Sequence, residues 1–352
     1  MSEWESKSLA QFVTFQRGFD LPKSQFISGD IPVFGSTSIL GYHSLSKVAA
    51  PGVITGRSGT LGKFQYSAVA FWPHNTTLWV KDFKGNDPKF SYYLMQCFDF
   101  SDLNGGGAVP TLNRNVLKSL KVDVPPLPAQ QKIAKILSNY DDLIESNLKR
   151  IKLLEESARL TYEEWFLRFR IDGKKLEIDS TSDLPFGWEW KLLKDFGEVV
   201  TGKTPSTNNE DYFGGNIPFV KTPSMHGNTY TLETQEYLTK LGASTQKNKF
   251  LPKNSLMVSC IGSAGVYSLV ANDCQTNQQI NSIKFCKDEY SFYIFGFAGY
   301  LTNILDAIGS NGATMTNVNK TKFENIKVAM PSSDLLERFH SIYSSNFEAI
   351  LN

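Results

Sequence analysis

A regular pattern of apolar and polar positions runs from Ala129 to Phe169, a stretch that contains neither proline nor glycine. The positions that recur at alternating steps of four and three residues are Ile133, Leu137, Tyr140, Ile144, Asn147, Ile151, Leu154, Ala158, Thr161 and Trp165. This spacing predicts one long helix whose seam packs against another helix, as in a coiled coil. At about 1.5 Å per residue the helix is roughly 60 Å long. The polar seam position Asn147 either fixes the register of a partner helix or marks a solvated part of the seam.

A shorter helical pattern lies at residues 332–352, in which Leu335, Phe339, Ile342 and either Phe347 or Leu351 have similar spacing. It is about half as long as the central pattern, so we expect it to cover only part of the central seam. The remainder of the seam is then left for another chain or for another copy of this one.

The sequence after the long helix repeats features of the sequence before it, in the same order. Trp4-Glu5 matches Trp188-Glu189, and the residues Leu9, Phe12 and Gly18 match Leu193, Phe196 and Gly202. Four longer segments match as well: "GDIPVFGS" with "GNIPFVKT"; "GVITGRSGTLG" with "SLMVSCIGSAG"; "FSYYLMQCF" with "YSFYIFGFA"; and "LKVDVP" with "IKVAMP". Two copies of one domain are the simplest explanation. The predicted fold is mixed α/β, with similar domains at residues 1–125 and 188–331, a spacer helix at 126–170, a linker at 171–187 and a short, truncated second helix at 332–352.

Residues Gly197 to Thr204 match G-x-x-x-x-G-K-[ST], the phosphate-binding loop of nucleotide-binding proteins. The match lacks its required context, because Pro205 disfavours a helix that starts at Thr204. In the repeat, moreover, the segment stands opposite "FVTFQRG", which has no such character. The sequence therefore argues against an ATPase.

Composition excludes some classes of protein and leaves others open. The 352 residues include 36 basic and 35 acidic side chains, which excludes a uniformly basic nucleic-acid coat but not a local basic patch. The four cysteines form no CxxC pair, so we expect free buried thiols and no metal site. The N-terminus lacks the apolar core of a signal peptide, and the apolar run from Phe292 is too short to span a bilayer. We expect a cytoplasmic protein with a buried helix at that run and no membrane partner.

Three further segments carry a family resemblance: "PPLPAQQKIAKIL" at the start of the long helix, "YEEWFLRF" at its end, and "LPFGWEW" after it. Together with the duplication, they make the whole chain resemble the DNA specificity subunit of type I restriction-modification systems. The second helix departs from this pattern, because "MPSSDLLERF" lacks the Pro-Leu-Pro-x-Gln-Gln letters.

The resemblance implies two target-recognition domains that each read half of a bipartite double-stranded DNA target and are held apart by antiparallel helices. It also implies that methyltransferase (modification) and restriction subunits supply the chemistry, with S-adenosylmethionine and ATP bound there and no cofactor on this chain. The interface residues implied on the long helix are Gln130, Gln131, Ile133, Leu137, Tyr140, Ile144, Asn147, Ile151, Leu154 and Trp165.

Polar loops in both copies carry the side chains that read base edges and contact phosphates. The DNA-binding candidates are Arg17, Arg57, Ser58, Thr60, Lys63, His74, Asn75, Thr76 and Arg114 in the first copy, and Lys203, Thr204, Lys221, Ser263, Asn277, Gln278, Gln279 and Asn317 in the second. We expect "HNTT", from His74, and "TNQQ", from Thr276, to occupy equivalent places. Ordinary tight turns with solvated side chains remain the alternative for each loop.

No catalytic motif is present in the sequence: an N-P-P-[FY] methyltransferase motif, a P-D with E-x-K nuclease pattern and an H-E-x-x-H metal helix are all missing. We therefore expect a chain that is not an enzyme. A coiled-coil assembly adaptor with duplicated domains and no DNA readout is the alternative function.

Overall fold

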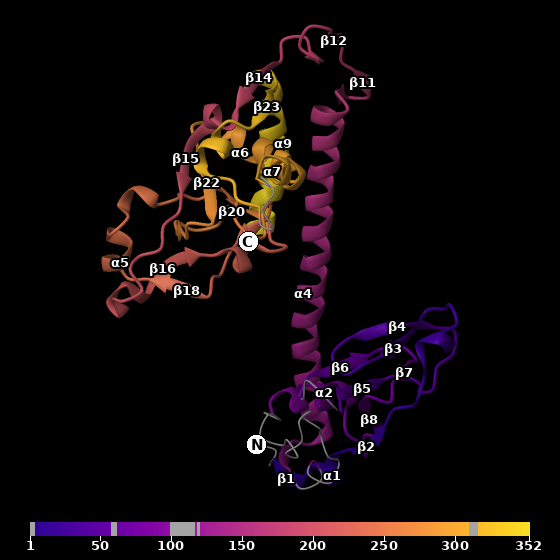
Figure 1. Cartoon of the computed structure of the whole chain (residues 1–352). Coiled ribbons are helices and arrows are strands. Elements are labelled where there is room, and N and C mark those ends of the chain that lie inside the picture. The colour runs from indigo at the N-terminus through magenta and orange to yellow at the C-terminus, as the bar shows by residue number, and fades with distance from the viewer. Residues whose placement is uncertain (1–3, 58–61, 99–116, 118–119, 310–315) are drawn as a thin grey trace. The chain divides into compact units, whose positions relative to one another are not determined.

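The computed structural model describes residues 4–57, 62–98, 117, 120–309 and 316–352. The chain divides into two compact units, Met1–Ser146 and Asn147–Asn352, called unit 1 and unit 2 below. The boundary falls inside helix α4, Leu127–Tyr162, which has 36 residues and continues as a π-helical turn, Glu163–Leu167. The predicted long helix is confirmed, but it is not a separate domain, because its two ends belong to different units (Figure 1).

The described part of unit 1 contains three small sheets and, before α4, the helices α1 and α2 and the short turn η1. Its elements are β1 (Glu5–Ser8), α1 (Leu9–Phe12), β2 (Thr14–Arg17), η1 (Lys23–Gln25), β3 (Ile31–Phe34), β4 (Ile39–His43), β5 (Gly52–Gly56), β6 (Phe64–Ser67), β7 (Trp72–Pro73), β8 (Thr77–Asp82), α2 (Pro88–Gln96) and β9 (Lys121–Val124). The largest sheet has the order β2-β8-β5-β6 and is antiparallel throughout. The second sheet has the order β4-β3-β7, with β3 and β7 parallel, and β1 pairs with β9.

Unit 2 repeats this arrangement with additional helices. Its strands are β14 (Glu189–Leu192), β15 (Gly197–Thr201), β16 (Phe213–Val220), β17 (Tyr230–Thr231), β18 (Glu236–Leu238), β19 (Leu256–Ser259), β20 (Tyr267–Val270), β21 (Gln275–Thr276), β22 (Ile280–Phe285) and β23 (Lys327–Met330). Its helices are α5 (Lys240–Ser244), α6 (Glu289–Ala298), α7 (Leu301–Gly309), α8 (Lys320–Glu324) and α9 (Ser333–Leu351), with short turns η4 (Leu193–Phe196), η5 (Glu210–Tyr212), η6 (Thr222–Met225) and η7 (Lys247–Lys249). The sheets that these strands form are β15-β22-β19-β20-β17, β18-β16-β21 and β14-β23.

The two units therefore share a sheet topology, to which unit 2 adds the edge strand β17, and the predicted duplication is confirmed. In both, the strand at the centre of the largest sheet is a short apolar run: β5 lies between β8 and β6, and β19 lies between β22 and β20. Every residue of β5 and β19 is buried, as such a run predicts for a strand covered on both faces.

Equivalent aromatic side chains fill the two cores. Phe12 and Phe196 are both fully buried, and they pack edge-on against aromatic rings near the start of α2 and α6, respectively. The ring of Phe12 lies 6.3 Å from that of Phe90, and the ring of Phe196 lies 5.2 Å from that of Tyr290. The sequence repeat therefore corresponds to a repeat of the core.

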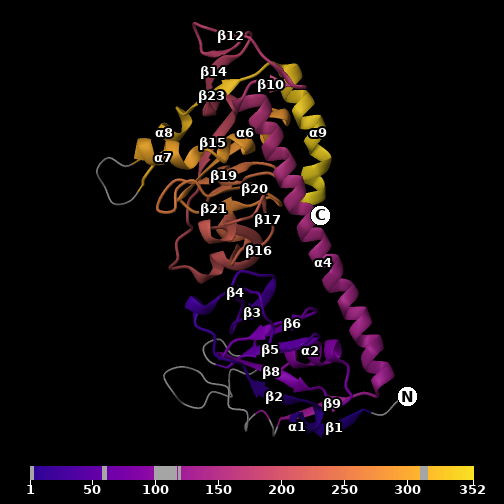
Figure 2. The ribbon, with the colours of Figure 1, turned by 90° about the vertical axis from the view of Figure 1, so that its right-hand side faces the viewer.

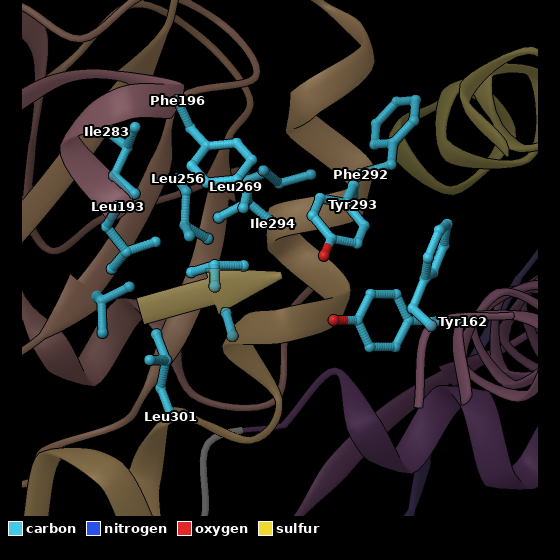
Figure 3. Packing of buried hydrophobic residues seen from close by; sticks show 14 of the residues in the cluster. Tyr162, Leu193, Phe196, Leu256, Leu269, Ile283, Phe292, Tyr293, Ile294 and Leu301 are labelled. Atoms are coloured by element: carbon cyan, nitrogen blue, oxygen red, sulfur yellow. The ribbon is translucent and has the colours of Figure 1, made fainter. Parts of the chain in front are cut away.

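The core of unit 2 extends further, onto the end of α4 and onto α9. Figure 3 shows Tyr162 of α4 facing Tyr293 of α6, and the rings of Tyr162 and Tyr293 lie 5.8 Å apart. Phe339 of α9 packs against Trp165 and Phe166. The helix predicted at 332–352 is thus confirmed as α9, and it lies beside the last turns of α4 (Figure 2).

Polar contacts also join α9 to the end of α4. The hydroxyl of Tyr343 donates to the carbonyl oxygen of Ser157 at 3.1 Å and bonds Thr161, so Thr161 is a hydrogen-bonded seam position. Arg338 forms a bidentate ion pair with Asp172 at 2.8 and 3.0 Å.

The segment expected to be a linker, residues 171–187, is folded. It contains two hairpins, β10 (Arg170–Ile171) with β11 (Lys174–Lys175), and β12 (Ile178–Asp179) with β13 (Leu184–Pro185). Leu184 is buried in the core of unit 2. The segment therefore belongs to unit 2, because its apolar side chains are needed to cover that core.

The middle of α4 contrasts with its ends, because residues 139–150 are all exposed. This stretch includes apolar side chains with exposed fractions above one half, namely 62% for Tyr140, 57% for Ile144 and 61% for Leu148. Asn147 is exposed as well.

The apolar run from Phe292 forms α6 and α7, and its side chains line the core of unit 2, as predicted for a buried helix. Within the described residues no single helix has the length and apolar character to cross a membrane; α6 and α7 meet those two criteria only as a pair, bent by 66°.

Candidate nucleic-acid interface

Residues 74–77 form a tight turn in unit 1 between β7 and β8, called the unit 1 turn. The amide of Thr77 donates to the carbonyl oxygen of His74 at 2.9 Å and closes the turn. Gly18, just after β2, lies against it: its amide donates to Thr77 at 3.0 Å, and a Cβ at position 18 would lie 2.1 Å from the carbonyl oxygen of His74. Only glycine allows this approach of two backbones.

Polar side chains from three segments gather at the unit 1 turn. Asn75 donates through its side-chain nitrogen to the carboxylate of Asp20, and its backbone oxygen accepts from Arg17 Nε at 3.4 Å. The backbone oxygen of Thr76 accepts from the hydroxyl of Ser36 at 3.1 Å. Three predicted residues, Arg17, Asn75 and Thr76, are thus brought together. His74 joins them through a 3.1 Å contact between its Nδ1 and the Thr76 hydroxyl.

Arg57 also faces the unit 1 turn. Its amide donates to the carbonyl oxygen of Thr76 at 2.8 Å. Its side chain is half-buried, and the buried Nε has no hydrogen-bond partner among the described residues. Lys63 is exposed at the start of β6. The predicted residues Ser58, Thr60 and Arg114 lie outside the residues that the structure describes.

Residues 277–280 form the equivalent turn in unit 2, called the unit 2 turn. The amide of Ile280 donates to Asn277 at 3.3 Å, and the amide of Gly202 donates to Ile280 at 3.0 Å. A Cβ at position 202 would lie 2.1 Å from the carbonyl oxygen of Asn277, the same distance as at Gly18. The hydroxyl of Thr204 donates to Gln278 Oε1 at 2.7 Å.

The sheet registers correct the expected equivalence of the two turns by one residue. Val33 and Phe34 pair with Trp72 and Pro73, whereas Phe219 and Val220 pair with Gln275 and Thr276. His74 therefore corresponds to Asn277, and Asn75 corresponds to Gln278. The sequence alignment placed His74 opposite Thr276, because four polar residues in each copy could be matched in more than one register.

The remaining predicted residues of unit 2 have mixed environments. Asn277 is buried, and its side chain bonds only within the turn: its nitrogen donates to Gln279 Oε1, and its oxygen accepts from the amide of Gln279. It shapes the turn and does not present an amide at the surface. Lys221 forms an ion pair with Glu236, while Ser263 and Asn317 are exposed.

The segment that matches a phosphate-binding loop is β15 followed by an extended turn. The amide of Lys203 donates to the carbonyl oxygen of Thr276 at 2.9 Å, so it is not free to contact a phosphate. No helix begins at Thr204. The backbone thus lacks the geometry of a nucleotide-binding loop, as the sequence context indicates.

The helix residues predicted to contact other subunits fall into two groups. Leu137, Tyr140, Ile144, Asn147 and Gln131 are exposed. Ile133, Ile151 and Leu154 pack partly against the cores of the units, and Trp165 is buried.

Gln130 is not at a subunit surface, in contrast to its predicted role. It is buried in unit 1, where its side-chain nitrogen donates to Asn86 and to the carbonyl oxygen of Pro125, both at 2.9 Å, and its oxygen accepts from the amide of Asp87 at 3.0 Å. Its role is to anchor the start of α4 to its own domain, since all three bonds lie inside unit 1.

The sequence did not single out Asp20, Ser36 or Glu236, which contact the predicted residues. Asp20 and Asn75 are 55 positions apart and meet because residues 19 and 74 form a parallel bridge. An alignment of the two copies could have indicated Asp20 as the counterpart of Thr204. Among the described residues, no group of histidine, cysteine or acidic side chains could hold a metal ion.

Comparisons with known proteins agree with this architecture. The family model described as "Type I restriction modification DNA specificity domain" matches residues 1–156 and 185–335. The type I restriction enzyme HindI specificity subunit of Haemophilus influenzae is 29% identical, with 75% of this chain and 72% of that protein covered. The MjaIX specificity subunit of Methanocaldococcus jannaschii is 26% identical, with 82% and 69% covered.

A solved structure has the same fold. The crystal structure of a type I restriction-modification system S subunit from M. genitalium matches with a TM-score of 0.64 and 15% identity, over 99% of this chain and 95% of that one. The family model matches twice, once in each of the two units that share a sheet topology. The chain therefore belongs to the type I restriction-modification DNA specificity family and carries two copies of its domain.

Proposed function

We propose that the chain is the sequence-specific DNA-binding subunit of a type I restriction-modification complex, and that each unit reads one half of a bipartite double-stranded target. The observation that carries this proposal is the pair of equivalent turns. Their backbones are held by the same hydrogen bonds, whereas the polar side chains around them differ: Asp20 and Asn75 stand at one turn, and Thr204 and Gln278 at the other. A common backbone with different polar side chains suits two readers of different base sequences.

Partner subunits supply the chemistry in this proposal. Methyltransferase subunits dock on the exposed stretch of α4, where the apolar side chains of Tyr140, Ile144 and Leu148 need cover. A restriction subunit completes the assembly. S-adenosylmethionine and ATP bind to these partners, so the chain itself is non-catalytic and works in the cytoplasm.

The test is methylation sequencing of DNA from cells that express the methyltransferase subunits with and without this chain. We expect a bipartite methylated motif that is present only with the chain. An unchanged methylation pattern would overturn the proposal.

A second candidate function is an assembly adaptor that binds other subunits and does not read DNA. The exposed apolar stretch of α4 favours it, because that stretch fits a protein partner and gives no information on DNA. A competition assay distinguishes the two functions: the purified complex is offered DNA fragments of different sequence, and its retention on each fragment is measured. Retention on one sequence that is lost when Arg57 and Gln278 are replaced by alanine supports DNA reading, whereas equal retention on all sequences supports the adaptor.

We also propose that the length of α4 sets the number of unspecified base pairs in the target. Seven residues inserted after Ser146 add about 10 Å of helix and preserve the heptad phase. Since B-DNA rises about 3.4 Å per base pair, the gap in the methylated motif should grow by about three base pairs, with both half-sequences unchanged. An unchanged gap would mean that something other than α4 sets it.

A further inference from the structure

We propose that Asp20 and Thr204 are positioning residues that hold the side-chain amides of Asn75 and Gln278 in place, so that each unit reads one base of its half-site through a held amide, and that Asp20 also fixes the direction of the Asn75 amide. This inference rests on the proposed DNA-reading function and adds to it. Asp20 and Thr204 act through the neighbouring amides, and the base that Asn75 recognises follows from its contact with Asp20.

The two pairs occupy the same place in the two units. The amide of Phe19 donates to Pro73 at 2.8 Å, and that of Lys203 donates to Thr276 at 2.9 Å. One residue further along, Asp20 contacts Asn75 and Thr204 contacts Gln278. The same side-chain contact thus occurs twice on the same backbone framework, although the residues that make it are different.

The chemistry of Asp20 determines which end of the Asn75 amide faces it. An ionised carboxylate only accepts hydrogen bonds, so the amide nitrogen must point to Asp20 and the amide oxygen must point away. One N–H of the nitrogen and the oxygen have no other hydrogen-bond partner in the part of the chain that the structure describes. These are the donor and acceptor that pair with N7 and N6 of adenine in the major groove, so the structure assigns an adenine to Asn75.

The contact at Thr204 is less restrictive. Its hydroxyl donates to the oxygen of Gln278 at 2.7 Å, but a hydroxyl can also accept, so the opposite orientation of the amide keeps a hydrogen bond. The backbone of Asn75 is in addition held by Arg17, through the 3.4 Å contact to its carbonyl oxygen. We therefore expect the base read by Asn75 to be the more strictly selected of the two.

The experiment uses the full chain in complex with its methyltransferase subunits, and methylation sequencing as the readout. Asp20→Asn replaces the acceptor-only carboxylate by an amide that tolerates either orientation of Asn75. We expect roughly tenfold weaker discrimination at a single adenine of one half-site, with the other half-site unchanged. Asn75→Ala should relax the same position, and the double variant should be no worse than Asn75→Ala alone.

Matched variants separate positioning from folding. Asp30→Asn changes an exposed aspartate of the same unit away from the turn and should leave the motif unchanged. Asp20→Glu keeps an acceptor-only carboxylate and should retain the original motif. If Asp20→Asn abolishes methylation altogether, recovery of the original motif with Asp20→Glu supports the proposal, whereas no recovery or a relaxed motif overturns it.

Failure of the inference can be told from failure of the proposed function. If Asn75→Ala relaxes one position but Asp20→Asn relaxes none, the unit 1 turn reads DNA and Asp20 does not position the amide. If neither variant changes the motif, although removal of the chain abolishes methylation, the unit 1 turn is not the reader and both proposals fail there. In unit 2, Thr204→Val should relax one base of the other half-site, and Thr204→Ser should not.

Discussion

Unit 1 and unit 2 share a backbone framework but place different chemistry on it. At the unit 1 turn the side chain of Arg17 brings a positive charge to Asn75, and Arg57 is bonded to Thr76 through its backbone amide. At the unit 2 turn, Cys260 takes the place of Arg57. The backbone amide of Cys260 donates to the carbonyl oxygen of Gln279 at 2.8 Å, and the amide of Arg57 donates to that of Thr76 at the same distance. Burial raises the pKa of the Cys260 thiol to about 11, so this position carries no charge at neutral pH.

The difference separates the residues that hold a turn from those that give it chemical character. Gly18 and Gly202 are equivalent because the backbone geometry requires glycine at both places. Arg57 and Cys260 differ because only their backbone amides are needed for the framework. The side chain at such a position is therefore free to differ between the two units.

The largest predicted effect concerns the two cores. Phe12→Ala and Phe196→Ala remove equivalent, fully buried rings, so each should cost about 3–5 kcal/mol of stability in its own unit. Hydrogen exchange measured by mass spectrometry on peptides from both units gives the stability of each. Equal loss of protection in both units from either substitution would contradict their description as separate compact units.

The next effect concerns the glycines at the two turns. In Gly18→Ala or Gly202→Ala the new methyl group lies 2.1 Å from a backbone oxygen, so the strands must move apart at a cost of about 1–3 kcal/mol. Exchange of the Phe19 amide should rise in the first variant and that of the Lys203 amide in the second. Unchanged exchange in either variant would mean that the two backbones do not approach as closely as described.

A smaller effect is predicted on subunit assembly. Ile144→Asp together with Leu148→Asp places charges on exposed apolar positions of α4, so binding of methyltransferase subunits should weaken at least tenfold, which is about 1.4 kcal/mol, while both units stay folded. Ser146→Asp is the control, since it adds a charge at an exposed polar position. Ile151 is unsuitable because it packs against the core of unit 2. Sedimentation of the mixed subunits gives the affinity, and equal binding by the double variant and the control would contradict docking at this stretch.

The smallest effect is a pH dependence confined to unit 2. Burial lowers the pKa of His340, whose ring stacks on Phe292 at 4.8 Å, while Asp288 and Glu289 act in the opposite direction. Since the folded-state pKa lies below the unfolded value of about 6.5, the unfolded chain binds the proton more readily. The stability of unit 2 is therefore fully present above about pH 6.5 and falls slightly as the pH decreases below it. Thermal melts between pH 7.5 and 5 should show this decrease, and His340→Phe should remove it.

Much of the fold was predictable because its signals are local or repeated. The seam of α4 follows from the spacing of apolar residues, and the duplication follows from pairs such as Phe12 and Phe196. The folded hairpins at 171–187 were missed because their strands have two residues each, too few for a periodic pattern. Gln130 was misassigned because adjacent glutamines look alike in sequence, although Gln130 is buried and Gln131 is exposed.

The candidate site was only partly predictable for a different reason. Arg57, Asn75 and Gln278 were found because their side chains have the chemistry of base recognition. Asp20 was missed because its role depends on a contact with a residue 55 positions away, which only the pairing of residues 19 and 74 brings about. The one-residue error in matching the two turns likewise required the sheet registers to correct it.

The most direct test of the central claim is methylation sequencing with two sets of variants in the assembled complex. Arg57→Ala with Asn75→Ala changes only the unit 1 turn, and Lys203→Ala with Gln278→Ala changes only the unit 2 turn. Each lost base contact should cost about 1–3 kcal/mol, so the first set should relax one half of the motif and the second set the other half. Relaxation of the same half by both sets, or uniform weakening across all sequences, would contradict the account of two separate readers.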